Sequence, residues 1–311
     1  MNRIPRPIRR ALESLASSPI NASALAMAEG KDFAHDSLYR ALQQPLALYF
    51  TLALELCYQK GGLQRGYLIL DDVLIPRYSA GHLKLQRFKD LSSGAYTYGF
   101  ALVVLAWTDG QTRLPLAFLP YFGGEEASRL DLALSLLAWA ATEGFKPEGV
   151  LFDAWYASGE VLAWLHARGW PLVTRLRSNR LLDGIQLKRQ GGAHWVKVGR
   201  LRGLTFPVQV VRRWRKFYAT DQVGWEGRRV VEVYRLRQAI EEMFRGLQQE
   251  LGWVGHRHRK RVRLLAHLAL GMVAYGLIEL QRERLKLSFY QCRRKLMVGT
   301  LTLDLSPLEA A

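Results

Sequence analysis

The sequence predicts an α/β protein built on a mixed sheet with flanking helices. Three features of the 311 residues support this prediction: short apolar runs of strand length, longer stretches with helical spacing, and the alternation of the two along the chain. A chain of this length, 49% of it hydrophobic, can bury the core of one large domain with smaller attachments.

Apolar runs predict the strands of this sheet. They cover residues 67–70, 96–107, 114–120, 150–152 and 172–176. The first run is predicted to end at Asp71 and Asp72, and the fourth to stop at Asp153. The turn at Asp109 and Gly110 is expected to join the second and third strands as a hairpin.

An apolar residue every three or four positions predicts helices between and after the strands. These helices cover residues 125–142, 158–168, 233–251 and 264–280. Residues 179–229 are rich in Gly, Arg and Trp, with alternating segments that predict a β-rich insertion. The first 65 residues are predicted to be helical. Within them, residues 22–28 and 37–42 around Gly30 fit either a DNA-binding helix-turn-helix or a plain helical hairpin.

The charge balance indicates an anionic partner. Lys and Arg number 44 against 27 acidic residues, which gives a formal net charge of +17. Nucleic acid is the commonest partner for such a charge, although a basic housekeeping protein has the same balance.

Several other classes are disfavoured. Cys57 and Cys292 are the only cysteines and lie far apart in the sequence, so no disulfide framework or zinc finger is expected. Residues 1–10 are rich in Arg and Pro and do not have the pattern of a secretory signal. The longest apolar run, residues 264–280, contains His267 and Glu279 and is shorter than the ~20 residues of a membrane span. We expect a cytoplasmic protein that does not contact a membrane.

The order of the elements matches a ribonuclease-H-like fold. In that fold, acidic residues at the ends of the first and fourth strands meet a carboxylate from a late helix. We therefore expect a helical N-terminal DNA-binding region (1–65), a first part of the core (66–178), a β-rich insertion (179–230), a part with the late helix and the helices after it (231–284), and a C-terminal tail (285–311).

Asp71, Asp153 and Glu241 are the candidate acids. Asp71 and Asp153 follow predicted strands, where the sites of such sheets usually lie, although a lone Asp there is more often a turn residue or a helix cap. Convergent carboxylates can hold two hard cations for phosphodiester cleavage. On strand alternation, only one of Asp71 and Asp72 can point toward Asp153.

The helix predicted over residues 233–251 has two faces, at about 100° per residue. Its buried arc consists of Leu236, Ile240, Met243, Leu247 and Leu251. Its polar arc consists of Tyr234, Arg237, Glu241, Arg245 and Gln248. Either this second arc is an ordinary solvated stripe, or Glu241 binds metal while its neighbours bind phosphates.

Residues 234–241, with the sequence YRLRQAIE, closely resemble the Tyr-Arg-Glu-Lys signature of DDE transposases of the insertion-sequence-four group. That signature is Tyr, two residues, Arg, three residues, Glu, six residues and Lys. Asp71-Asp72 and the segment DAWY starting at Asp153 resemble the two earlier acidic motifs of the group. The predicted insertion also falls between the second Asp and the Glu, as it does there. The likeness covers residues 67–275.

The resemblance implies a DNA transposase. Asp71, Asp153 and Glu241 would be catalytic and would ligate Mg²⁺ or Mn²⁺, with two ions expected. Cleavage at the transposon ends would free a 3′ hydroxyl that attacks target DNA. The implied partners are double-stranded DNA, both transposon ends and target, and a second copy of the chain in a homodimer. The expected DNA-contacting residues are Tyr234, Arg237, Arg245, Gln248, Arg257, Arg259, Lys260 and Arg261.

Two positions depart from the signature, and other functions remain open. Gln248 stands where the signature has Lys, and Val73 stands where Thr or Ser is common. Asp71 is preferred to Asp72 because it matches the first position of its motif. The alternatives are a non-catalytic DNA-binding protein derived from a transposase, a ribonuclease-H-like nuclease that does not join strands, and a two-carboxylate glycosidase, for which the basic face has no role.

Overall fold

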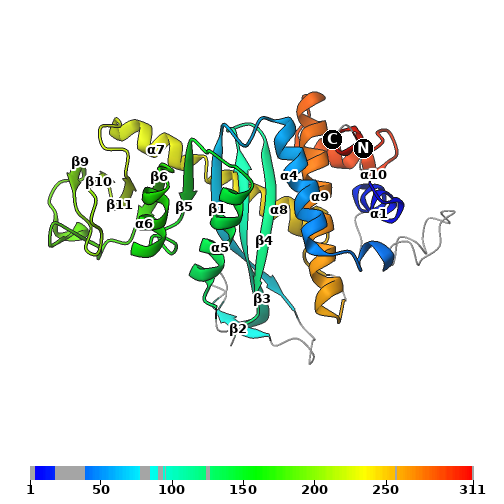
Figure 1. Cartoon of the computed structure of the whole chain (residues 1–311), viewed down its shortest axis with the longest axis horizontal. Helices are drawn as coiled ribbons and strands as arrows, with labels where there is room; N and C mark the ends of the chain where they lie inside the picture. The colour runs from blue at the N-terminus through cyan, green and yellow to red at the C-terminus, as the bar shows by residue number, and fades with distance from the viewer. Residues whose placement is uncertain are drawn as a thin grey trace.

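A nine-stranded sheet forms the centre of the computed structural model (Figure 1). The structure describes residues 4–17, 39–77, 85–89, 94, 96–123, 127–255 and 258–309. The strands are β1 (Tyr67–Pro76), β2 (Gln86–Lys89), β3 (Tyr96–Thr108), β4 (Arg113–Tyr121), β5 (Gly149–Phe152), β6 (Leu172–Leu176), β9 (His194–Gly199), β10 (Val208–Arg213) and β11 (Lys216–Thr220). The prediction of a mixed sheet with flanking helices is confirmed.

The sheet is parallel at its centre and antiparallel toward both edges. Its order is β2-β3-β1-β5-β6-β11-β10-β9, with β4 paired to β3. Strand β5 runs parallel to β1 and β6, whereas the other pairings are antiparallel. The strands predicted within residues 179–229 therefore extend the main sheet through β6. A short hairpin of β7 (Leu181–Leu182) and β8 (Ile185–Gln186) lies off it.

Helices cover both faces of the sheet. They are α1 (Arg6–Ser17), α4 (Leu46–Gln59), α5 (Arg129–Thr142), α6 (Gly159–Ala167), α7 (Gly227–Arg235), α8 (Gln238–Glu250), α9 (Arg261–Arg284) and α10 (Phe289–Met297), with 3₁₀ turns η1 (Leu187–Arg189) and η2 (Ser306–Leu308). Because side chains alternate along a strand, Leu68 and Leu70 of β1 belong to the core of α5 and α6, whereas Ile69 belongs to the core of α7, α8 and α9.

The two ends of the chain pack together against α9. Helix α1 contacts α9 and α10, and α10 also contacts α8, so the predicted C-terminal tail contains a packed helix. The helix-turn-helix candidate at residues 22–28 and 37–42 lies outside the described residues except for its last positions. Strand β2 was not predicted, since its four residues, Gln86–Lys89, carry little apolar pattern.

Helix α9 is the core of this end of the molecule. Among the described residues, it is the one helix long and apolar enough to cross a bilayer, and 94% of its apolar window is buried inside the protein. It packs against α1, α4, α8, α10 and β4. The predicted helix over residues 264–280 thus extends to both sides, and it has the surroundings of a core helix.

Strand β1 is longer than predicted. It does not end at Asp71 but continues to Pro76. The reason is that β3 is 13 residues long and pairs with β1 over the whole length of β1. Strand β5, in contrast, pairs with β1 only up to Leu70 and Phe152. Asp71 therefore lies inside β1, at the level where its parallel neighbour ends.

The prediction of a single helix over residues 233–251 was also wrong. Two helices occupy this region. Helix α7 ends at Arg235 and α8 begins at Gln238. Between them, Arg237 N donates to the Tyr234 carbonyl at 3.1 Å and Ile240 N donates to the Arg237 carbonyl at 3.1 Å. These i to i+3 bonds make a tight 3₁₀-type turn, which separates the two helices at a place with no Gly or Pro to indicate it.

A buried ion network fixes α8 against α9 and the β3–β4 hairpin. Glu279 of α9 is fully buried and accepts from Arg113 Nε at 3.0 Å and from Arg282 Nε at 3.0 Å. Arg113, at the start of β4, also pairs with Glu242 of α8. Since Glu242 follows Glu241, this network helps to set the rotation of α8 about its axis.

Replacing Glu279 by Gln should lower the free energy of unfolding by about 3–5 kcal/mol, because two partly buried guanidinium groups lose their shared, fully buried charged partner. Urea denaturation measures this loss. The matched control is Glu232→Gln, which breaks the exposed pair with Arg228 and should cost less than about 1 kcal/mol. Equal losses for the two variants would contradict a special role for the buried network.

Candidate active site

Asp71 of β1 lies beside Asp153, which directly follows the neighbouring strand β5. The parallel register pairs Leu70 with Phe152, so the next residue on each strand, Asp71 or Asp153, comes at the same level. Paired residues of neighbouring strands point to the same face of the sheet. Both aspartates thus have the orientation of Ile69 and Leu151, toward α7 and α8. The structure brings these two predicted site residues together.

Asp72 points to the opposite face. Its Oδ2 accepts from Arg129 Nη1 at 2.8 Å, and its Oδ1 accepts from the Tyr156 hydroxyl at 3.0 Å. Burial, and next the charge of Asp72, raise the pKa of Tyr156, so the hydroxyl remains a donor. Asp72 therefore ties β1 to α5 and to the segment after β5, away from Asp153.

The backbone after β5 fixes the carboxylate of Asp153. Its Oδ1 accepts from the backbone N of Trp155 at 2.8 Å and of Tyr156 at 3.3 Å. This is the turn-capping role expected of an Asp after a strand. A carboxylate has lone pairs for further partners, so this role and a metal-binding role are compatible.

Arg237 joins Glu241 to Asp71. Its Nη2 donates to Glu241 Oε1 at 2.5 Å, and its Nη1 pairs with Asp71 Oδ2. The side chains of Arg237 and Asp71 are 16% and 15% exposed, whereas that of Glu241, in the first turn of α8, is 55% exposed. Arg237 thus links two of the three predicted acids, Asp71 and Glu241, and Asp71 in turn lies beside Asp153.

Burial raises the pKa of Asp71 to about 7. The positive charge of Arg237 lowers it, and the negative charges of Asp153 and Asp72 raise it. Loss of water around a carboxylate therefore outweighs its ion pair here. Shifts of this size are most frequent at functional sites, although structural ion networks also cause them.

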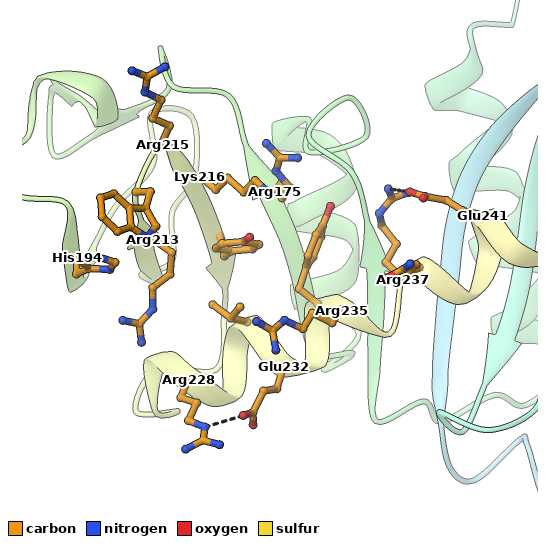
Figure 2. Close-up of a pocket in the computed structure, with 15 residues that line it drawn as sticks. Arg175, His194, Arg213, Arg215, Lys216, Arg228, Glu232, Arg235, Arg237 and Glu241 are labelled. Atoms are coloured by element: carbon orange, nitrogen blue, oxygen red, sulfur yellow. Dashed lines mark hydrogen bonds and ion pairs between the residues drawn. The ribbon is translucent and has the colours of Figure 1, made fainter. Parts of the chain in front are cut away.

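A basic cavity of about 910 Å³ opens beside these carboxylates (Figure 2). Arg237 and Glu241 form one end of its lining, and the β10–β11 hairpin forms the other. Its cationic lining residues are Arg175, Arg213, Arg215, Lys216, Arg228, Arg235 and Arg237, against the two acids Glu232 and Glu241. Such an excess of positive charge suits an anionic ligand.

Trp214 forms the tip of the β10–β11 hairpin and lines the cavity. Its side chain is 70% exposed and its φ is +56°, a left-handed conformation that a bulky residue rarely adopts. The ring of His194 meets it edge to face at 5.0 Å. This hairpin was not among the predicted DNA contacts, although Arg213, Arg215 and Lys216 around a Trp are the pattern expected of a nucleic-acid contact.

Tyr234 lies on the wall of the same cavity. Burial raises its pKa to about 12, so its phenol stays protonated at neutral pH. Its ring packs edge to face against that of Tyr218 at 5.2 Å. The helix break thus leaves Tyr234 and Glu241 on one cavity even though they belong to different helices.

The other predicted DNA contacts lie outside this cavity. Arg245 is exposed on α8, whereas Gln248 donates to the carbonyl of Leu74 at 3.4 Å and is tied to β1. Arg259 and Lys260 precede α9, and Arg261 stacks over Phe122 at 4.1 Å, just beyond the end of β4. Arg257 lies outside the described residues. Helix α9 and the β10–β11 hairpin lie toward opposite sides of the molecule (Figure 1), and a role of this basic run in DNA binding stays a prediction.

The oxygen donors suit a hard divalent cation, but they are not arranged around one. Within the described parts of the chain, no group of three or more His, Cys, Asp or Glu side chains has metal-holding geometry. Asp71 and Glu241 instead share the guanidinium cation of Arg237. Two carboxylates that share one cation are chemically suited to Mg²⁺ or Mn²⁺, provided that Arg237 moves.

The raised pKa of Asp71 predicts a specific loss of stability with rising pH. The folded protein keeps the proton that the unfolded chain, with a pKa near 3.9, loses earlier. The contribution of Asp71 to stability is therefore full below about pH 4 and is lost as the pH rises through 7. Between pH 5 and pH 7, in EDTA, the loss of this contribution should lower the free energy of unfolding by about 2 kcal/mol.

Asp71→Asn should lack this part of the pH dependence, as measured by urea denaturation at the two pH values. The constant effect of the substitution cancels, because only the difference between pH 5 and pH 7 is compared. The same pH dependence in both proteins would mean that Asp71 titrates in its ordinary range.

One solved structure and one family model are similar to this chain. The cryo-EM structure of a piggyBac transposase synaptic complex with hairpin DNA has a similar fold, with a TM-score of 0.54 and 9% sequence identity. The superposition covers 99% of this chain and 73% of that chain. At this identity the likeness concerns the fold alone. No curated protein matches the sequence.

The family model described as the transposase DDE domain matches residues 64–277. This range contains β1 and α8, which carry Asp71 and Glu241, and Asp153, which directly follows β5. Because it spans more than half of the chain, the protein belongs to the family of transposases with a DDE domain.

Proposed function

We propose that the protein cleaves double-stranded DNA at transposon ends and joins the freed ends to target DNA. The observation that carries this proposal is that Asp71 lies beside Asp153 and is joined through Arg237 to Glu241, at one end of a large basic cavity. In the first reaction, a water oxygen bonds to phosphorus and the 3′ oxygen leaves and takes up a proton. In the second, the oxygen of that 3′ hydroxyl loses its proton and bonds to a phosphorus of the target, and the target's own 3′ oxygen leaves and takes up a proton.

Asp71, Asp153 and Glu241 are the proposed ligands of two Mg²⁺ or Mn²⁺ ions in a ribonuclease-H-like core. Bound there, the ions would activate the attacking oxygen and stabilise the leaving one. Support for the core comes from the parallel strands β1, β5 and β6 with antiparallel β3 next to β1. The position of Asp71 on β1, level with Asp153 directly after β5, supports a shared site.

The cavity residues have the chemistry to hold DNA next to these acids. Arg213, Arg215 and Lys216 on the hairpin can pair with phosphates. Tyr234, protonated at neutral pH, can donate a neutral hydrogen bond to a phosphate oxygen. The exposed ring of Trp214 offers a surface for a base that leaves the duplex. Joining two transposon ends requires two active sites, and we propose a homodimer for that step.

The second candidate is a transposase-derived protein that binds DNA without cutting it. Gln248 favours this candidate, because it is tied to the Leu74 carbonyl and supplies no charge to a phosphate. Incubation with Mn²⁺ and DNA that carries the ends of the element separates the possibilities. Joined strands indicate a transposase, and nicks alone indicate a nuclease. DNA that is bound by the protein but not nicked indicates the non-catalytic protein.

Asp71→Asn, Asp153→Asn and Glu241→Gln should each reduce cleavage on the order of 10³-fold or more, with DNA binding largely unchanged. The reason is that a neutral amide does not hold a divalent cation as a carboxylate does. Single-turnover cleavage assays and gel shifts measure the two properties.

Asp72→Asn is the matched control for these variants. It changes the same chemical group one residue away, on the face where Arg129 and Tyr156 bind it. It should keep cleavage within about tenfold of the parent, in proportion to its effect on stability. If Asp72→Asn abolished cleavage and Asp71→Asn did not, the assignment of the two residues would be reversed.

The cavity predicts a change in the salt dependence of DNA binding. Replacing Arg213, Arg215 and Lys216 by Gln should lower the magnitude of the slope of log K against log salt by about 2.7, at about 0.9 for each phosphate contact. The control replaces Arg65, Lys146 and Arg168 by Gln, which removes the same charge but does not alter the cavity. Equal slopes for the two triple variants would place the DNA elsewhere.

A further inference from the structure

Arg237 occupies the position between two of the proposed metal ligands. It contacts Asp71 through Nη1 and Glu241 through Nη2, and both contacts are made by one planar guanidinium group. Each contacted oxygen, Asp71 Oδ2 and Glu241 Oε1, is a lone-pair donor that a metal ion would use. A divalent cation and Arg237 therefore compete for the same oxygen atoms.

The cavity offers Arg237 a different partner. Arg237 lines it together with Arg235 and Gln238, and its other cations make the cavity strongly positive in the absence of an anion. A phosphate group placed there would accept the same two parallel hydrogen bonds that Asp71 and Glu241 now accept. The guanidinium group can thus leave the carboxylates without losing a charged partner.

The backbone at Arg237 is a suitable place for such a change. Arg237 lies in the tight turn between α7 and α8, where i to i+3 hydrogen bonds replace those of a regular helix. A short 3₁₀ stretch between helices often marks a hinge. Helix α8 itself is held by the pair of Glu242 with Arg113, so movement at the turn would shift Arg237 more than Glu241.

We propose that Arg237 is an internal cation that keeps the metal site closed until a DNA phosphate enters the cavity. Without DNA, Arg237 neutralises Asp71 and Glu241 and holds metal affinity low. With DNA, Arg237 binds a phosphate, and the two carboxylates become free for metal ions. Binding of DNA and binding of metal then favour each other by the same factor. This inference rests on the proposed function, since it concerns the same three acids.

The test measures Mn²⁺ affinity without any reaction, from the electron paramagnetic resonance signal of free Mn²⁺ in the presence of the isolated, DNA-free protein. Arg237→Gln should bind Mn²⁺ at least about tenfold more tightly than the parent, because the charge-assisted competitor is gone. Arg237→Lys should lie between the two, since an ammonium group does not bridge two carboxylates as a planar fork does. Circular dichroism verifies that each variant is folded.

Arg235→Gln is the control for a general effect of charge. It removes one positive charge from the same cavity, two residues away, and Arg235 lacks the bridging position of Arg237. Its Mn²⁺ affinity should stay within about threefold of the parent. If Arg235→Gln tightened Mn²⁺ binding as much as Arg237→Gln, competition by Arg237 would be refuted.

A second measurement tests the coupling to DNA. Adding a duplex that carries the element's ends should tighten Mn²⁺ binding by the parent, and it should do so several-fold less for Arg237→Gln. An equal DNA effect in both proteins would refute the proposal. Asp71→Asn and Glu241→Gln report on the proposed function itself. If these two variants bind Mn²⁺ like the parent, the metal site is elsewhere. If they lose Mn²⁺ binding while Arg237→Gln keeps the parental affinity, only the proposed role of Arg237 is refuted.

Discussion

Parallel pairing of β1 with β5 decides where the candidate acids Asp71 and Asp153 lie in this protein. The pairing stops at Leu70 and Phe152, so Asp71 and Asp153 follow at one level and on one face. Strand β1 then continues along β3, which keeps the backbone of Asp71 extended while the chain turns away after β5. A slip of one residue in β1 would turn Asp71 toward α5 and bring Asp72 to α8.

Two adjacent aspartates consequently have different electrostatic surroundings. Asp72 has partners from two other segments, Arg129 and the Tyr156 hydroxyl, and stabilises the fold. Asp71 is buried beside Asp153, with Arg237 as its cation, and its pKa is raised to about 7. The charge of Asp72 is thus balanced by partners within the protein. The surroundings of Asp71 have an excess of negative charge that a metal ion would relieve.

The sequence predicted the parts of this arrangement that depend on local pattern. Apolar runs identified the strands before Asp71 and Asp153, and the helical spacing of Ile240, Met243 and Leu247 identified the buried face of α8. Alternation along β1 also established that Asp71 and Asp72 point to opposite faces. These features follow from the period of a strand or a helix, which neighbouring residues set.

Features that depend on distant residues were not predictable in this way. The continuation of β1 to Pro76 depends on the length of β3, and the break before Gln238 has no Gly or Pro to indicate it. The cavity combines α7, β6 and the β10–β11 hairpin, whose approach follows from the antiparallel pairing of β11 with β6. The role of Arg237 depends on its contact with Asp71, a residue 166 positions away.

The unbroken sheet has a mechanical consequence. Because β1, β5, β6, β11 and β10 are hydrogen-bonded in that order, the hairpin cannot swing relative to Asp71 as a separately hinged domain would. Four strand spacings of about 4.8 Å place the hairpin strand roughly 19 Å from β1, a length that corresponds to about half a turn of duplex DNA. For a ligand bound at the hairpin, the rigid sheet would set the distance between the bound part of the ligand and the reacting bond.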